Sequence, residues 1–377
     1  MKISAEAKTL LDLAIVRHGQ GRYGEALDCL LALEARLPDH PGVLANLGMV
    51  CRDNGDLVRA EQYLRQACAA RPNDPAAHYN LALTLLRAGR LREGFEEYEW
   101  RWQVRQFAAQ RREFPQPLWR GEPLAGLRIL IHGEQGAGDA IQFVRYAPLV
   151  RNAGGEATIE VLPHLERLLG WMEGEYRIVN AFSAGSQFDV HCPLLSLAQR
   201  FGTELDSIPA PARFFIPAAM QAKWATRLRT GRTRAGVAWA GNPNNYNDGA
   251  RSLPAHFLVP LTRLAGIEWW SLQVGPAAGD IPDGLANLAE DLVDFGETAA
   301  AISALDLVIT VDTAVAHLAG SLGKTVWLLA AYASDWRWML HREDTPWYPS
   351  MRIFRQQRPG EWGEVMERVA AELQGFG

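Results

Sequence analysis

The sequence has few cysteines, no long apolar run and no strong excess of either charge. Its 377 residues include four cysteines, and none of these forms a CxxC pair. Three of them fall in segments with a helical pattern, so we expect buried, reduced thiols rather than disulfides or a zinc site. None of the four is a candidate nucleophile: Cys29, Cys51, Cys68 and Cys192.

The lack of long apolar runs argues against a membrane or secreted protein, and the modest net charge argues against a nucleic-acid-binding protein. No stretch reaches the length of a membrane span, and residues 1–6 lead into charged amphipathic sequence without the apolar core of a signal peptide. We therefore expect a cytoplasmic protein with no membrane span. A net charge of -5 and an isoelectric point near 6.0 give no general attraction to nucleic acid, which is not an expected partner.

The first hundred residues repeat with a period of 34. Gly21, Gly55 and Gly89 recur at this interval, as do Pro38 and Pro72. The period is that of antiparallel helix pairs, with glycine near the turn and proline before the next helix. The second unit resembles the tetratricopeptide repeat, with Cys51 at its usual tyrosine position and these residues at its signature spacing: Gly48, Ala60, Leu64, Ala67 and Pro72. We expect about three repeats within residues 1–110.

Two roles are open for so short a stack. Its concave face can bind a protein partner, or the stack can brace the domain that follows, because three repeats form only a shallow groove. The aromatic segment 95–102 is interpreted as a helix that packs onto the next domain rather than as a ligand site.

After a proline-containing linker at 114–119, short apolar runs alternate with helical patterns. This alternation predicts parallel sheets, arranged as two Rossmann-like lobes over 120–230 and 231–377, with a break near Thr230. Ligands are expected at the carboxyl ends of the strands, in the cleft between the lobes. A helix is predicted over 139–153 and a closing helix over 361–375. The predicted strands are 127–132, 157–161, 188–193, 234–239, 268–273, 307–311 and 325–329.

The first candidate site is the glycine-rich turn 132–139, between a strand and a helix. It has neither a GxGxxG pattern nor a P-loop lysine, and Glu134 and Asp139 would repel a phosphate. The turn therefore suits acid/base chemistry better than phosphate binding, with Asp139 as the base and Gln135 and Gly138 beside it. Asp139 can equally be a helix cap.

Two further turns offer groups for an anionic ligand. Asp312, Thr313 and Ala314 follow an apolar strand, and His317 lies one turn into the next helix, where a lone histidine is more often structural. The polar loop from Asn242 to Pro254 contains Arg251, the cation best suited to a phosphate. This loop is either a mobile lid or a solvated surface loop.

The segment 332–349 is unusually aromatic. Trp336 and Arg337 can belong to a wall on which a sugar or a base stacks. The alternative, which we favour, is a packed seam between lobes, because tryptophan often fills such seams.

Together, these motifs resemble the glycosyltransferase-B class and, within it, the heptosyltransferase-like members of glycosyltransferase family 9. The resembling residues are Gly138-Asp139, Arg251 with Pro254, and Asp312-Thr313-Ala314 with His317. The resemblance implies that Asp139 deprotonates an acceptor hydroxyl, while Arg251 and the Asp312 turn hold the donor diphosphate. It also implies inversion at the anomeric carbon, with no metal and no cofactor beyond the nucleotide-sugar substrate. The loop around Glu134 lacks the family's usual serine-rich sequence, and its lipopolysaccharide enzymes lack fused repeats, which argues against a heptose donor and a lipid acceptor.

Three functions follow as hypotheses. The first is a glycosyltransferase whose repeats recruit a protein acceptor, by analogy with repeat-fused enzymes that modify intracellular proteins or flagellin. The second is a scaffold that keeps the two-lobed body without turnover. The third is a nucleotide-sugar epimerase, for which Glu134, Asp139, His132 and His317 would have to face one cleft.

Overall fold

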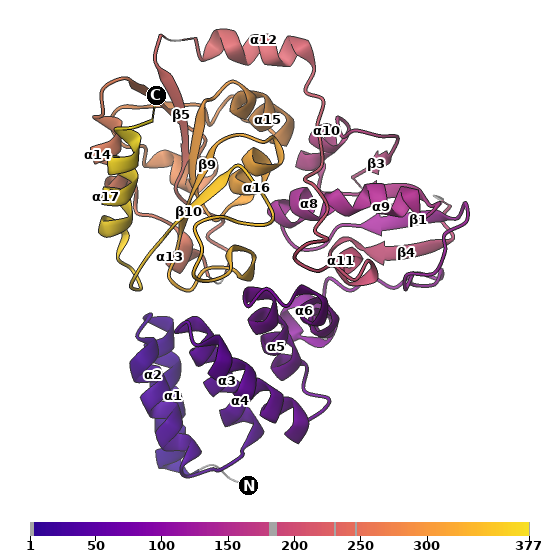
Figure 1. The fold of residues 1–377 in the computed structure, drawn as a ribbon, viewed down its shortest axis with the longest axis vertical. Coiled ribbons are helices and arrows are strands. Elements are labelled where there is room, and N and C mark those ends of the chain that lie inside the picture. Colours follow the sequence, from indigo (N-terminus) through magenta and orange to yellow (C-terminus); the bar gives the residue numbers. More distant parts are fainter. Residues whose placement is uncertain (1–3, 181–186, 230, 246, 377) are drawn as a thin grey trace.

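The computed structural model describes residues 4–180, 187–229, 231–245 and 247–376. The chain begins with three antiparallel helix pairs, drawn in indigo and purple in Figure 1. Their bounds are α1 Ala5–Gly19, α2 Tyr23–Glu34, α3 Pro41–Asp53, α4 Leu57–Ala70, α5 Pro75–Arg87 and α6 Leu91–Tyr98.

Small residues let the paired helices of the stack approach each other. A Cβ added at Gly48 of α3 would lie 2.4 Å from Leu64 of α4 and 3.0 Å from the Ala60 carbonyl. Gly21, Gly55 and Gly89 end the turns within the three repeats at φ of 73°, 89° and 80°, a conformation that favours glycine. The 34-residue period therefore marks real turns, one within each of the three helix pairs.

The turns of all three repeats face the rest of the protein. Gly21 lies against Pro359, Gly55 lies near Tyr332, and Gly89 lies near Leu205. The Tyr332 hydroxyl donates to the Asn54 carbonyl at 2.9 Å. The backbone carbonyl of Tyr332 accepts from the Arg87 guanidinium at 3.1 Å. The stack therefore braces both lobes of the body, one of the two roles expected for it.

The first lobe is a four-stranded parallel sheet in the order β3-β2-β1-β4. The linker after the repeats, which contains α7 Arg105–Ala108, runs to its edge, where the Trp119 amide donates to the His191 carbonyl at 2.8 Å. The strands are β1 Arg128–His132, β2 Glu156–Glu160, β3 Arg177–Val179 and β4 Val190–Pro193; the helices are α8 Ala137–Phe143, α9 Ala147–Asn152, α10 Glu166–Leu169 and α11 Leu197–Arg200.

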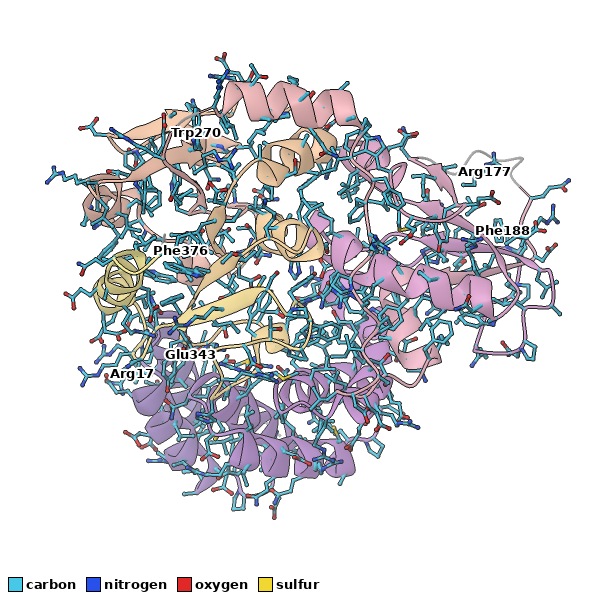
Figure 2. All side chains as sticks on the ribbon, turned by 45° about the horizontal axis from the view of Figure 1, so that its top comes forward. Arg17, Arg177, Phe188, Trp270, Glu343 and Phe376 are labelled. Atoms are coloured by element: carbon cyan, nitrogen blue, oxygen red, sulfur yellow. The ribbon has the colours of Figure 1, made fainter. Side chains whose placement is uncertain are left out.

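The second lobe is a six-stranded parallel sheet in the order β10-β9-β8-β5-β6-β7. Phe376, after the last helix, lies on this lobe (Figure 2). Its ring centre is 5.5 Å from that of Trp327. The strands are β5 Thr233–Ala238, β6 Ile267–Ser271, β7 Leu285–Asn287, β8 Leu307–Val311, β9 Val326–Ala330 and β10 Met351–Arg355; the helices are α13 Asp248–Arg251, α14 Val259–Thr262, α15 Phe295–Ser303, α16 Ala314–Ser321 and α17 Trp362–Leu373.

The helix α12 Ala218–Arg227 joins the two lobes across the top of Figure 1. Its Trp224 is fully buried and donates from its indole nitrogen to Glu297 of α15 at 2.8 Å. Arg167 of α10 in the first lobe also pairs with Glu297, at 3.4 Å. The lobes are therefore held together on this side by α12, α10 and α15.

The expected architecture, a repeat stack followed by two parallel α/β lobes, is confirmed. The prediction of one continuous helix over 139–153 was wrong. That segment forms α8, a 3-10 turn at Val144–Tyr146, and α9, in whose first turn Pro148 lies. Proline has no amide to continue the hydrogen bonds of α8, so a new helix begins there. Position 230, the predicted break, lies outside the described residues.

Candidate active site

The candidate site lies where a helix N-terminus of each lobe meets the other. In the first lobe α8 follows β1, and in the second lobe α16 follows β8, so both begin at the carboxyl ends of strands. A Cβ added at Gly138 of α8 would lie 2.8 Å from the His317 ring and 3.4 Å from the Ala314 Cα of α16. The structure thus brings together the first two sequence motifs, which are about 175 residues apart in the chain.

Asp139 is the carboxylate that the first lobe contributes to the candidate site. Its Oδ2 accepts the Gly136 amide at 2.9 Å, which caps α8, and its Oδ1 accepts from Arg337 at 2.6 Å. Burial raises the pKa of this carboxyl, and the Arg337 charge opposes that effect. The side chain remains 21% exposed, so a ligand can still reach it. Asp139 is therefore a helix cap that also keeps an accessible carboxylate.

Arg337 lies between the lobes. It belongs to the 3-10 turn Trp336–Trp338 after β9, and its buried guanidinium donates to Asp139, to Gln142 of α8 and to Asp335. The group also lies over the Trp336 ring, 4.3 Å from its centre. Although burial alone would lower the pKa of Arg337, the two carboxylates hold it above its ordinary value, so the group stays charged.

Asp312 and Arg251 face the same region from the second lobe. Burial raises the pKa of Asp312 to about 6, assisted by the Asp335 carboxylate and opposed by the charges of Arg251 and Arg337. The Arg251 guanidinium packs on Gly241 and donates to Asp248 at 3.2 Å. The positive charges of Arg251 and Arg337 therefore balance the negative charges of two carboxylates, Asp312 after β8 and Asp335 after β9.

The first turn of α16 has no side-chain cap. The hydroxyl of its N-cap, Thr313, instead lies 3.2 Å from that of Thr310. Uncapped amides at a helix N-terminus favour negative ligands. His317 adds no charge to this end, because burial, and then the nearby arginines, lower its pKa far below the ordinary value. Its Nδ1 lies 3.0 Å from the Tyr348 hydroxyl, so it is a neutral, buried histidine.

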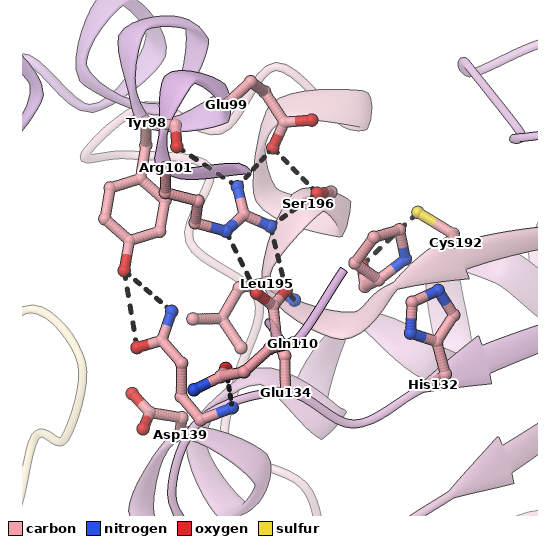
Figure 3. Close-up of polar contacts among 12 residues, drawn as sticks. Tyr98, Glu99, Arg101, Gln110, His132, Glu134, Asp139, Cys192, Leu195 and Ser196 are labelled. Atoms are coloured by element: carbon pink, nitrogen blue, oxygen red, sulfur yellow. Dashed lines mark hydrogen bonds and ion pairs between the residues drawn. The ribbon is translucent and has the colours of Figure 1, made fainter. Parts of the chain in front are cut away.

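Glu134 requires a correction. It was expected to favour acid/base work, but both of its oxygens accept from Arg101 of the 3-10 turn Glu99–Gln103, at 2.8 and 3.0 Å (Figure 3). Burial alone would lower the pKa of Arg101, yet the Glu134 and Glu99 carboxylates raise it above the ordinary value. This buried ion pair joins the repeat stack to the first lobe and leaves no carboxylate oxygen free of a cation.

Gln135, the next residue of that loop, also contacts the stack, whereas His132 contacts its own lobe. Gln135, at a φ of 60°, donates from its amide to the Tyr98 hydroxyl at 3.0 Å. His132, named for the epimerase hypothesis, lies apart from Asp139 (Figure 3). Its Nε2 is 3.3 Å from the Nδ1 of His191. Burial, together with His191, lowers the pKa of His132 to about 3, so it is a neutral histidine.

Trp336 also requires a correction. The residue is only 4% exposed, and its ring meets Phe95 of α6 edge-on at 5.6 Å and Trp347 at 5.8 Å between ring centres. No ring face is left on which a sugar can stack. Phe95 also contacts Phe143 of α8, at 6.1 Å, so the repeats and both lobes share one aromatic junction. The packed-seam interpretation, and the docking role of segment 95–102, are confirmed.

The third motif is the polar loop from Asn242 to Pro254. Asn242 is exposed, and its side chain accepts the Asn244 amide at 3.0 Å in a local turn; position 246 of this loop lies outside the described residues. Sequence reasoning missed Gln273, whose buried Oε1 accepts the amides of Trp239 and Ala240 at 3.0 and 2.9 Å. Gln273 thereby fixes the end of β5 from which the Asn242 loop begins.

Two features of the described residues bear on other predictions. No three His, Cys, Asp or Glu side chains come together there as metal ligands. None of the described helices combines the length and the apolarity needed to cross a bilayer. Metal independence and a cytoplasmic location stay predictions.

Comparison with known proteins adds the following. Residues 11–75 match the family model of the tetratricopeptide repeat. Protein FlbA of Caulobacter vibrioides is 27% identical over 348 residues, which are 82% of this chain and 58% of that protein. The chain thus spans little more than half the length of this curated relative.

Two solved structures resemble the α/β body. A glycosyl transferase family 9 protein from Veillonella parvula is 13% identical, with a TM-score of 0.48, over 68% of this chain and 99% of that chain. The ADP-heptose lipopolysaccharide heptosyltransferase II of Escherichia coli is 14% identical, with a TM-score of 0.44, over 67% and 100% of the respective chains.

The contact between α8 and α16 gives a first prediction. In Gly138→Ala, the new methyl group must displace the buried His317 ring or part the lobes. We expect a loss of about 1–3 kcal/mol in the free energy of unfolding, the usual cost of overpacking. The matched control is Gly24→Ala in α2, where a Cβ meets nothing within 4 Å. Urea denaturation should show a loss for Gly138→Ala alone; equal midpoints for both variants would contradict this contact.

Proposed function

We propose that the protein is a glycosyltransferase that moves a sugar from a nucleotide-sugar to an acceptor hydroxyl, in the cleft between its two lobes. The observation that carries this proposal is the meeting of Asp139, a base from the first lobe, with the cations and the uncapped helix N-terminus of the second lobe. An acid/base group and an anion-binding group on opposite sides of one cleft suit the transfer of a group away from a diphosphate.

The reaction follows from these positions. As the acceptor oxygen attacks the anomeric carbon, its proton passes to the Asp139 carboxylate. The bond from that carbon to the diphosphate breaks, and the diphosphate leaves with the electron pair. Arg251, the Thr313 hydroxyl and the first amides of α16 would stabilise the charge that develops on it. Attack from the side opposite the diphosphate inverts the anomeric centre, and the step needs no metal.

The acceptor is proposed to be a protein, of the flagellin kind or another intracellular one, held by the repeats. The support is architectural: the stack packs on both lobes, so a chain bound along it lies beside the cleft. The epimerase hypothesis is less well supported, because His132 and His317 are buried and neutral and Glu134 is paired with Arg101. The scaffold hypothesis differs from the transferase hypothesis in predicting no turnover of a nucleotide-sugar.

Thermal stabilisation by a panel of nucleoside diphosphates and monophosphates tests donor binding. A ligand at 100 times its dissociation constant stabilises the native state by about 2.7 kcal/mol, which raises the melting temperature by several degrees. We expect one nucleotide to do so, and the shift to be lost in Arg251→Ala and Asp312→Ala. Arg263→Ala, an exposed arginine of the same lobe, is the control that should keep it.

The outcomes separate the hypotheses. A shift that the two site variants lose identifies the donor base and leads to an assay for transfer to acceptor proteins. A shift with no release of nucleotide from any matching nucleotide-sugar favours the scaffold. The absence of any shift in the wild-type protein contradicts the proposed donor site.

A further inference from the structure

The link between Asp139 and Arg337 crosses from one lobe to the other. Asp139 lies on α8 of the first lobe, and Arg337 lies after β9 of the second lobe, 198 residues later in the chain. Arg337 contacts the first lobe twice, because it donates to Gln142 one turn further along α8 as well as to Asp139. Two bonds from one planar guanidinium fix the direction of the helix face as well as that of the carboxylate.

Arg337 is itself held rigidly. Its Nη1 and its backbone amide both donate to Asp335, at 2.9 and 3.0 Å. The guanidinium lies over Trp336, and Phe143 of α8 lies 5.7 Å from it on the first lobe. With 6% of the residue exposed, the group has little freedom to leave this position while the lobes stay together. It is therefore preorganised by the second lobe toward a target on the first.

The arrangement leaves Asp139 able to act. An ionised carboxylate offers about four lone-pair positions. Two are taken, one by the Gly136 amide and one by Arg337, and the exposed part of the side chain leaves another for an acceptor hydroxyl. The bond from Arg337 thus orients the carboxylate without blocking it.

We propose that Arg337 is the positioning residue of the reaction: it carries a charge and a hydrogen bond from the second lobe that hold the Asp139 carboxylate ionised and oriented, and it does so only when the lobes are together. This inference rests on the proposed function. It makes the base ready only in the arrangement of lobes that also completes the donor site, so that a nucleotide-sugar in open lobes would not meet an active base. Arg337 acts through Asp139 and is not itself assigned to the substrate.

Two variants of the full chain should shift the pKa of Asp139 in opposite directions. Removing the Arg337 charge in Arg337→Gln should raise the pKa of Asp139, because burial is then less opposed. Removing the Asp335 charge in Asp335→Asn should lower it, because a repelling carboxylate is lost while the amide oxygen can still cap Arg337. General structural damage would not produce opposite shifts. Arg342→Gln, an arginine that pairs with Asp344 nearby, is the control and should change nothing.

The measurement is a pH titration of the Asp139 carboxyl carbon in protein labelled with [13C]aspartate, with the resonance assigned by its loss in Asp139→Asn. A higher titration midpoint of Asp139 in Arg337→Gln, together with a lower one in Asp335→Asn, supports the inference. An unchanged midpoint in Arg337→Gln overturns it. If Arg337→Gln does not fold, Arg337→Lys is titrated in its place, because a single ammonium cannot reproduce the two bonds to Asp139 and Gln142. A midpoint above that of the wild-type protein then supports the inference, and an unchanged one overturns it.

Kinetics then test the role in the reaction. With a nucleotide-sugar selected by the thermal panel, Arg337→Gln should move the acidic limb of kcat/KM to higher pH and lower kcat by about a hundredfold, the scale of a misplaced catalytic group, with KM little changed. An acidic limb at the wild-type position overturns the positioning role. If the carboxyl midpoints move as expected but the wild-type protein shows no turnover, the proposed function fails instead, and the two failures are distinguishable.

Discussion

Replacing Arg101 by methionine is expected to lower the free energy of unfolding by about 3–5 kcal/mol, the cost of leaving a buried charge without its partner. Arg101 is fully buried, and the Glu134 side chain is 2% exposed. The same guanidinium also donates to Ser196 at 2.8 Å and to Glu99 at 2.6 Å. Urea denaturation followed by tryptophan fluorescence measures the loss, and limited proteolysis should release the repeats from the body sooner.

The control for this prediction is Arg36→Met. Arg36 pairs with Glu6 at a similar distance, 2.8 Å, but on the surface of the stack, where such pairs contribute about 0–1 kcal/mol. The double variant Arg101→Met with Glu134→Met should recover much of the stability, because the unpaired buried carboxylate is then also removed. If Arg101→Met costs no more than Arg36→Met, the ion pair does not hold the stack to the body.

Local spacing was sufficient for much of the fold. The 34-residue period predicts the helix pairs because turns and close helix contacts need small residues at fixed intervals, as Gly48 shows against Leu64. Strands buried on both faces, such as Leu307–Val311, are mostly apolar and easily recognised. The three-residue strands β3 and β7 were missed, because such short segments show neither a period nor an apolar run. Strand β10 was missed as well.

The candidate site was only partly predictable, for a different physical reason. Asp139, Asp312 and His317 follow strands at local turns, which a sequence displays directly. The partners that determine what these groups do are distant in the chain: Arg337 meets Gln142 across 195 residues, and Gln273 meets the amide of Trp239 across 34. Glu134 looked free in the sequence because Arg101, 33 residues earlier, gave no local sign of their pairing.

Asp139→Asn is expected to lower kcat/KM for sugar transfer by about 10²- to 10⁴-fold, the usual contribution of a general base. The new amide has one acceptor oxygen where the carboxylate has two, so it can accept from the Gly136 amide or from Arg337, but not from both as Asp139 does. We therefore expect a folded protein that loses one of these two bonds and melts somewhat below the wild-type protein. The thermal shift with the donor nucleotide should also persist, because Asp139 lies on the acceptor side of the cleft.

The matched control is Asp344→Asn, which changes an exposed carboxylate of the second lobe and should leave transfer unchanged. Transfer and nucleotide release are measured together, at several pH values, for the wild-type protein and both variants. Loss of transfer with retained nucleotide binding assigns the proton-accepting step to Asp139. If Asp139→Asn transfers sugar at the wild-type rate, Asp139 only caps α8, and another group must take the proton from the acceptor.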